Sequence, residues 1–151
     1  MLDNKRCPIN SKERQSRIIG KATNELYPYY GATGQVGFID EYKIDGEYLL
    51  VGEDGAPFLD KYASKAYLIQ GKSWVNNHAH ILKPMINQSY MLYVLNAISY
   101  KPYVNGTTRL KLTQEALRRI SVPVPPIKEQ ERIAEKVFTL FSQIDALLEF
   151  L

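Results

Sequence analysis

The C-terminal end of the chain carries its most regular hydrophobic pattern. Apolar residues recur at alternating intervals of four and three, the heptad spacing with which one helix packs along another; they are Ile133, Val137, Leu140, Ile144, Leu147 and Leu151. A second row widens the stripe and consists of Ala134, Phe138, Phe141 and Leu148. The pattern predicts a helix over residues 128–151, about 36 Å long at 1.5 Å per residue. Such a helix needs an apolar partner, either its own domain or another chain.

Upstream of this helix, short alternating apolar segments are separated by turn residues, which is typical of β-strands. We expect one hairpin from residues 36–42 and 48–51, and a second from residues 65–70 and 72–82 that turns at Gly71. Proline fits the first turn of a helix but not its interior, so the two prolines of the V-P-V-P-P segment fit the start of the long helix.

Three smaller features complete the expected architecture. Apolar residues at helical spacing predict a helix over residues 88–98, and Thr113 can cap a short helix that ends at Arg119. Residues 120–124 are expected to form an edge strand, because Pro123 lacks a backbone donor. Residues 1–26 are polar and basic, and we expect them to be extended or loosely ordered, with a turn of helix at 13–19 as the alternative.

These elements define an α+β fold. A β-rich body with short helices would occupy residues 1–124, and a long C-terminal helix would occupy residues 125–151 and form an antiparallel coiled coil or spacer. The 151 residues suffice for one domain, or one domain plus an arm. No apolar run reaches the ~18 residues of a membrane span, no apolar signal region follows Met1, and one cysteine cannot form an internal disulfide. A cytoplasmic location is the economical interpretation.

Charge is sorted along the chain more strongly than the net value of +3 suggests. Residues 31–60 hold one lysine and seven acidic residues, whereas residues 61–114 hold seven lysines and arginines and no acidic residue. A long segment without acids favours an anionic partner, and double-stranded DNA is the leading candidate. Scattered, solvated lysines would give the same count, so charge alone leaves both interpretations open.

Residues suited to DNA contact gather near predicted turns and strand edges. Base edges in the major groove are read by amide, hydroxyl, guanidinium and ammonium groups, and aromatic rings can pack on sugar or phosphate. The candidate DNA-binding residues are Tyr29, Tyr30, Thr33, Gln35, Lys72, Trp74, Asn76, Asn77, His78, Asn105, Thr107, Thr108, Arg109 and Lys111. Each of them also has a plain structural explanation as a turn or core residue.

Catalytic and metal-binding patterns are weak. His78 and His80 would alternate on one face of a predicted strand, but a zinc site needs three or four ligands. Asp40, Glu41 and Lys43 resemble the short acid-x-lysine core of metal-dependent nucleases, a match that is common by chance. The Gly-Ala-Thr-Gly segment lacks the Gly-Lys-Ser/Thr end of a phosphate loop. The sequence therefore points away from catalysis, with no metal and no cofactor expected.

Four sequence blocks occur in order: P-Y-Y-G-A-T-G (28–34), L-L-V-G-E-D-G-A-P-F (49–58), W-V-N-N-H-A-H-I-L (74–82) and I-S-V-P-V-P-P-I-K-E-Q-E-R-I (120–133). Together they resemble the DNA-specificity subunit of type I restriction-modification systems. The matching positions are Gly31, Gly34, Gly52, Asp54, Gly55, Asn77, His78, Pro125, Pro126, Glu129 and Gln130.

The resemblance implies a target-recognition domain followed by one spacer helix. In such subunits two recognition domains are joined by paired antiparallel helices, which separate the two halves of a bipartite DNA site. Methylation and cleavage belong to partner methyltransferase (modification) and restriction subunits. This chain departs from the pattern, since it has one recognition domain and a shorter helix, so we expect self-association through the heptad seam.

Two other classes of function remain open from the residues alone. One is a small metal-dependent nuclease that uses Asp40, Glu41 and Lys43. The other is an assembly or antirestriction protein that occupies the methyltransferase through the same helix without reading DNA. Digestion of plasmid with divalent metal would separate the first, and sequence preference over random duplex would separate the second.

Overall fold

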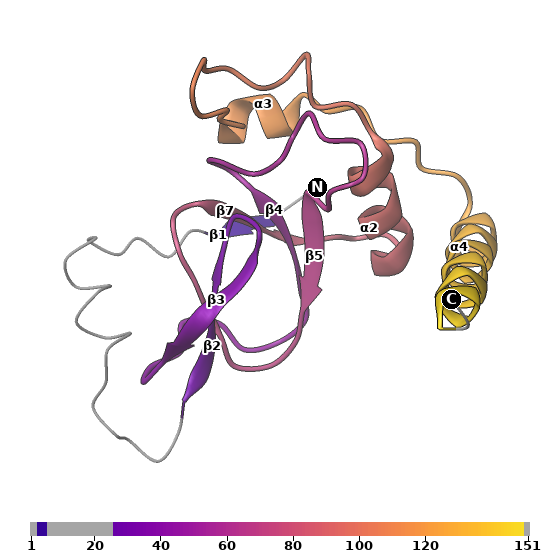
Figure 1. The fold of residues 1–151 in the computed structure, drawn as a ribbon, viewed down its shortest axis with the longest axis horizontal. Helices are drawn as coiled ribbons and strands as arrows, with labels where there is room; N and C mark the ends of the chain where they lie inside the picture. Colours follow the sequence, from indigo (N-terminus) through magenta and orange to yellow (C-terminus); the bar gives the residue numbers. More distant parts are fainter. Residues whose placement is uncertain (1–2, 6–25, 150–151) are drawn as a thin grey trace.

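The computed structural model describes residues 3–5 and 26–149, and two small β-sheets form its centre (Figure 1). In the four-stranded sheet every neighbouring pair is antiparallel, and the order is β1 (Asp3–Lys5), β7 (Ala79–Lys83), β4 (Tyr48–Gly52) and β5 (Ala66–Ile69). The three-stranded sheet has the order β3 (Gly34–Ile39), β2 (Tyr27–Gly31) and β6 (Trp74–Val75), with β2 antiparallel to β3 and parallel to β6. This confirms the expected α+β class.

In the described residues three helices follow the strands, and the one that begins after Thr113 is capped as predicted. Asn87 Oδ1 accepts the backbone N–H of Tyr90 at 2.9 Å and begins α2 (Gln88–Ala97). Thr113 Oγ1 accepts the N–H of Ala116 at 3.2 Å and begins α3 (Gln114–Arg118). The long helix α4 (Ile127–Leu148) starts directly after Pro126. In the part of the chain that the structure describes, no helix is both long and apolar enough to cross a membrane.

Strand β4 is buried on both faces and joins two clusters of the core. Leu49 and Val51 pack in a large cluster with side chains of α2 and α3. Leu50, between them, packs in a second cluster that includes Val75 of the smaller sheet. The four-stranded sheet therefore has helices on one face and the smaller sheet on the other, which explains why β4 is a continuous apolar run and not an alternating one.

Both predicted hairpins are wrong, although their strands exist. The strand over residues 48–51 pairs with β5 and β7 and not with the strand before it. The segment 72–82 is divided: β6 pairs with β2, and β7 pairs with β4 and β1. Because most residues of β4 and β7 are buried, each strand lies between two others, and this overrides pairing between sequence neighbours.

Residues 120–124 form no strand in the structure. The segment is held instead by the hydroxyl of Tyr90, which donates to the carbonyl oxygen of Pro123 at 3.0 Å. Pro123 and Pro125 each lack a backbone donor, which removes the ladder bonds that a strand would need. Within residues 1–26, residues 3–5 are extended as expected, while the predicted helical turn at 13–19 lies outside the described residues.

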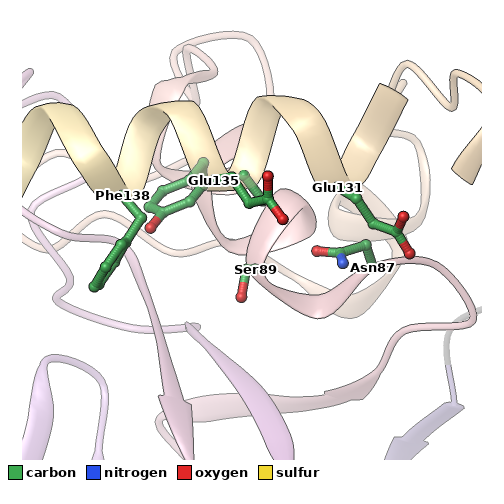
Figure 2. Close-up of a pocket in the computed structure, with 7 residues that line it drawn as sticks. Asn87, Ser89, Glu131, Glu135 and Phe138 are labelled. Atoms are coloured by element: carbon green, nitrogen blue, oxygen red, sulfur yellow. The ribbon is translucent and has the colours of Figure 1, made fainter. Parts of the chain in front are cut away.

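The part of α4 up to Phe141 docks against α2, and the part beyond it is exposed. Gln130 and Ala134 are the buried residues of the helix, and the Phe141 ring lies 6.3 Å from that of Tyr93, measured between centroids. A small pocket of about 260 Å³ marks this junction, rimmed by the carboxylates of Glu131 and Glu135 (Figure 2). The helix thus leaves the body from a fixed base.

The predicted heptad seam is mostly exposed beyond that base. Ile133 and Val137 are half-buried, whereas the exposed fractions of Leu140, Ile144 and Leu147 are 47%, 50% and 67%. Leu151, the last member of the seam, lies outside the described residues.

Candidate nucleic-acid interface

Four connecting segments meet at one end of the four-stranded sheet. The segment after β4 bonds to the β6–β7 turn, since the backbone N–H of Glu53 donates to the carbonyl oxygen of His78 at 2.7 Å. It also bonds to the 105–111 loop, since the N–H of Gly55 donates to the oxygen of Leu110 at 3.0 Å. The tip of the β2–β3 hairpin lies against Gly52, where an added Cβ would come within 2.8 Å of the carbonyl oxygen of Ala32.

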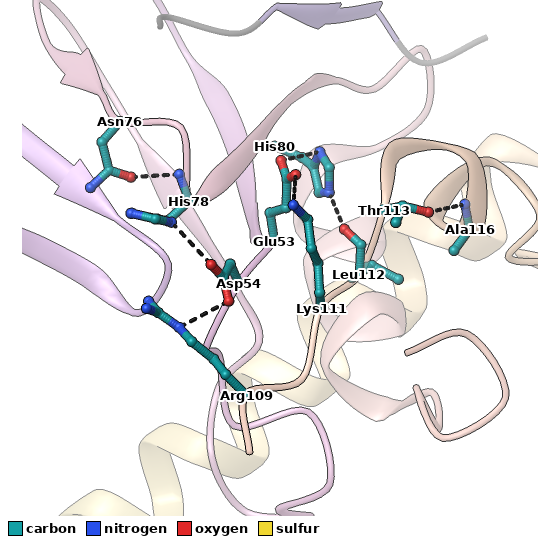
Figure 3. Close-up of polar contacts among 10 residues, drawn as sticks. All are labelled: Glu53, Asp54, Asn76, His78, His80, Arg109, Lys111, Leu112, Thr113 and Ala116. Atoms are coloured by element: carbon teal, nitrogen blue, oxygen red, sulfur yellow. Dashed lines mark hydrogen bonds and ion pairs between the residues drawn. The ribbon is translucent and has the colours of Figure 1, made fainter. Parts of the chain in front are cut away.

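Asp54 is the polar centre of this loop cluster (Figure 3). Its Oδ1 lies 2.9 Å from Nε of Arg109, and its Oδ2 lies 3.5 Å from Nδ1 of His78. The carboxylate is one-quarter exposed, whereas the arginine side chain is 60% exposed. Asp54 therefore holds an arginine that is otherwise open to a partner from outside.

A second acidic residue anchors the same loop from below. Glu53 is buried, with its Oε1 3.7 Å from Nζ of Lys111 and its Oε2 3.7 Å from Nδ1 of His80. His80 Nε2 in turn donates to the carbonyl oxygen of Leu112 at 2.8 Å. Because the end of the 105–111 loop is tied to β7 through these groups, the loop has a defined position on the sheet.

The two histidines do not share a strand face, contrary to the sequence prediction. His78 lies in the turn before β7 and His80 within it. The side chain of Asn76 makes this turn, since its Oδ1 accepts the backbone N–H of His78 at 2.9 Å. Among the described residues, no group of three or more His, Cys, Asp or Glu side chains could hold a metal ion.

Gly55 explains why the G-E-D-G block requires its second glycine. Its φ of +74° lies in the left-handed region, and a Cβ there would come within 2.7 Å of Nε of Arg109. A side chain at this position would therefore displace the arginine from Asp54. The block therefore shapes the loop and also places Arg109.

The structure brings most of the predicted DNA-binding residues to this one end of the sheet. These residues are exposed or half-buried and lie on three of the four segments just described: Thr33, Asn77, His78, Asn105, Thr107, Thr108, Arg109 and Lys111. We call this set the loop face. Residues from three separate regions of the sequence converge on it.

Three predicted contact residues have buried side chains and cannot reach DNA in this structure. The exposed fractions of Tyr29, Trp74 and Asn76 are 0%, 4% and 5%. Tyr29 and Trp74 form the core of the smaller sheet, and Asn76 makes the turn before His78. Their polar and aromatic character serves packing and turn formation, the alternative that the sequence left open.

The remaining three candidates make contacts within the smaller sheet and beside it. Lys72 is exposed and lies over the Tyr42 ring, with Nζ 5.0 Å from the centroid. Gln35 donates through Nε2 to the carbonyl oxygen of Gly37 at 3.2 Å. The Tyr30 ring is half-buried and lies 6.0 Å from that of Tyr67, again between centroids.

Two of the three residues of the nuclease alternative, Glu41 and Lys43, form an ion pair on the surface. Lys43 Nζ lies 2.7 Å from Glu41 Oε1 and 4.7 Å from the centroid of the Trp74 ring. The ammonium group of Lys43, on an exposed turn, therefore interacts with a neighbouring carboxylate and with an indole ring. Sequence reasoning did not identify Asp54 as the residue that orients Arg109. The G-E-D-G block, which contains Asp54, was the feature of the sequence that pointed to it.

Two solved structures share this fold. The S subunit of a type I restriction-modification system from M. genitalium matches with a TM-score of 0.71 and 16% identity, over 98% of this chain and 38% of that one. A second structure, described as underlying complex assembly and conformational transition of the type I restriction-modification system, matches with a TM-score of 0.62 and 18% identity over 85% of this chain.

The sequence comparisons give the family. Residues 3–149 match the family described as the type I restriction modification DNA specificity domain, and the chain belongs to that family. A putative type I restriction enzyme specificity subunit of Haemophilus influenzae is 32% identical over 137 residues, which cover 89% of this chain and 33% of that protein. The EcoprrI specificity subunit of Escherichia coli is 28% identical over 82% of this chain and 31% of its own length. The chain spans about a third of the length of these relatives.

Proposed function

We propose that this chain is a target-recognition module of a type I specificity subunit, which binds double-stranded DNA through the loop face and reads one half of a bipartite site. Residues 1–124 form the recognition domain, and residues 125–151 form the spacer. The chain performs no chemistry itself, and methyltransferase and restriction subunits act on the DNA that it selects. It acts in the cytoplasm, where these partners meet DNA.

The observation that carries this proposal is the arrangement of Arg109. Its Nε faces Asp54 at 2.9 Å, while 60% of the side chain remains exposed. An arginine fixed on one side by a carboxylate keeps its terminal NH₂ groups for a second acceptor. The preferred acceptors of such a fork are the O6 and N7 atoms of guanine or a phosphate.

The neighbours of Arg109 support DNA and not an acidic protein as the partner. Asn77, Thr107 and Thr108 are exposed beside it, and amides and hydroxyls both read base edges and hold phosphates. Lys111 adds a further exposed cation at 53%. Because Asp54 faces Arg109 and Glu53 faces Lys111, the two carboxylates orient these cations and neutralise part of their charge.

The exposed seam of α4 supports the second part of the proposal. Leu140, Ile144 and Leu147 expose about half or more of their side chains, and such a row on a helix is stabilised by a partner helix. We infer that this partner is an equivalent helix of a second recognition module, packed antiparallel, so that the two loop faces read two half-sites. A two-fold arrangement of this kind fits a symmetric bipartite site.

Duplex binding measured by fluorescence anisotropy tests the recognition proposal. We expect the affinity for duplex DNA to fall steeply with added salt, because cations on the loop face displace counterions. Arg109→Ala should weaken binding by about ten- to a hundredfold, the loss of a charged hydrogen-bonding group. Lys136→Ala, which removes an exposed charge from α4, is the matched control.

Asp54→Asn separates orientation from charge. It increases the net positive charge of the loop face, so an interaction driven by charge alone should strengthen. If Arg109 must be oriented, binding to the preferred sequence should weaken while binding to random duplex does not. A chain that ignores duplex DNA at low salt, alone and with its methyltransferase subunit, would overturn the proposal.

A further inference from the structure

A second basic site lies outside the loop face, where the loop before β5 meets the C-terminal end of α2. It is a pocket of about 560 Å³. Three lysines line it, Lys61, Lys65 and Lys101, together with Asp60 and Ser99. Lys61 and Lys101 are exposed at the rim, whereas Lys65 is 3% exposed.

Lys65 is built into the fold and is not a mobile surface lysine. Its backbone N–H donates to Oδ1 of Asn96 at 2.7 Å, and Nδ2 of the same asparagine donates to the carbonyl oxygen of Ala66 at 2.9 Å. The oxygen and the nitrogen of the Asn96 side-chain amide thus both attach the start of β5 to α2. The backbone of Lys65 is therefore held in place, and the residue lines the pocket.

The charge of the pocket is not balanced within the described residues. Among those residues, no hydrogen bond or ion pair is formed by Nζ of Lys61, Lys65 or Lys101. Asp60 is committed to its own turn, since its Oδ1 accepts the backbone N–H groups of Tyr62 at 2.8 Å and Ala63 at 3.3 Å. Three cations and one carboxylate thus leave the pocket electropositive.

The end of helix α2 does not account for three cations. A helix C-terminus carries about half a negative charge, and part of it is already satisfied by other groups. The hydroxyl of Tyr100 donates to the carbonyl oxygen of Leu95 at 2.8 Å, and the backbone N–H of Ile98 donates to that of Val94 at 3.1 Å. The three lysine charges exceed the negative charge of the helix end, so the pocket can accept an anion.

We propose that this pocket binds a phosphate group, with the ammonium groups of Lys61, Lys65 and Lys101 as its ligands. A phosphodiester of bound DNA and a free phosphate share this chemistry. One loop connects the pocket to the loop face: it carries Asp54 near its start and Lys61 and Lys65 near its end. The Phe58 ring, 5.4 Å from that of Tyr100 between centroids, fixes this loop to the core. Binding of a DNA phosphodiester in this pocket rests on the proposed function, whereas binding of a free phosphate does not.

Titration of the whole chain with inorganic phosphate tests the pocket without DNA. We expect saturating changes in backbone amide chemical shifts that are confined to residues 58–66 and 96–101, and no such changes with chloride at the same ionic strength. Lys65→Met should abolish them. Lys101→Ala replaces an exposed residue and keeps the test decisive if the buried substitution prevents folding.

Duplex binding identifies the source of the phosphate. Lys65→Met and Lys101→Ala should each weaken duplex binding about fivefold or more and lower the slope of log affinity against log salt by about one unit. Lys136→Ala should change neither.

Each result of these two experiments is decisive. Phosphate saturation with unchanged duplex binding assigns the pocket to a free phosphate. Phosphate saturation in a chain that binds no duplex supports the pocket and overturns the proposed function. Weaker duplex binding by the two lysine variants without phosphate saturation assigns the pocket to a DNA phosphodiester. Phosphate shifts no larger than those with chloride, together with variants that bind duplex as the parent does, overturn the inference.

Discussion

Gln130 sets the direction in which the spacer helix leaves the recognition domain. Its Oε1 accepts the backbone N–H of Asn87 at 2.9 Å, and its Nε2 donates to the carbonyl oxygen of Pro125 at 2.7 Å. The residue is 3% exposed. One side chain therefore ties the first turn of α4 both to the residue that caps α2 and to the segment before the helix.

Replacing Gln130 with leucine should be costly, because the volume is kept and both hydrogen bonds are lost. A buried backbone group without a partner costs about 1–3 kcal/mol. Two such groups, partly relieved by water at the edge of the interface, give a loss of about 2–4 kcal/mol in the free energy of unfolding. This is a large share of the 5–15 kcal/mol typical of a domain.

Chemical denaturation and amide hydrogen exchange measure this effect together. We expect Gln130→Leu to lower the denaturation midpoint and to speed exchange in α4 and at Asn87. Lys128→Leu adds the same side chain at an exposed position two residues earlier and should change stability by less than about 0.5 kcal/mol. A Gln130→Leu variant with parental stability and parental exchange in α4 would refute this role of the glutamine.

Three further predictions concern other parts of the molecule. Gly52→Ala should destabilise the fold by about 1–3 kcal/mol, measured by thermal unfolding, because its Cβ would come within 2.8 Å of a carbonyl oxygen at the β2–β3 tip. Ile144→Glu combined with Leu147→Glu should convert a self-associated species to a monomer in sedimentation; an unchanged assembly would place the contact elsewhere. Burial raises the pKa of Tyr67 and of Tyr100 above the ordinary value, so their contribution to stability is complete below pH ~10 and is lost as pH rises beyond it. A urea midpoint that stays constant through this alkaline range would contradict the last prediction.

The helices were predictable because their signals are local. Thr113 and the apolar spacing of residues 88–98 act within a few residues, and the structure uses them as expected. The pairing of strands depends on which segments are buried on both faces, which follows from the assembled core. For that reason the strand segments of the two hairpins were found while their pairing was wrong, and the strand predicted over residues 120–124 does not form.

The candidate site was predictable in part. The loop around Arg109 carried its own turn and contact chemistry, and the structure places it at the surface as expected. Tyr29 and Trp74 could not be placed, because the composition of a short aromatic strand does not show which face is covered. The role of Asp54 depends on His78 and Arg109, which lie more than twenty residues away in sequence. They come close to Asp54 only in the folded chain.

Selection from a pool of randomised duplexes tests the central claim most directly. The chain, with its methyltransferase subunit present, would be used to enrich bound DNA over several rounds, in parallel with the Arg109→Ala variant. We expect the parent to enrich one short sequence motif and the variant to lose or relax one position of it. A pool that stays random with the parent would contradict the claim that this chain reads DNA.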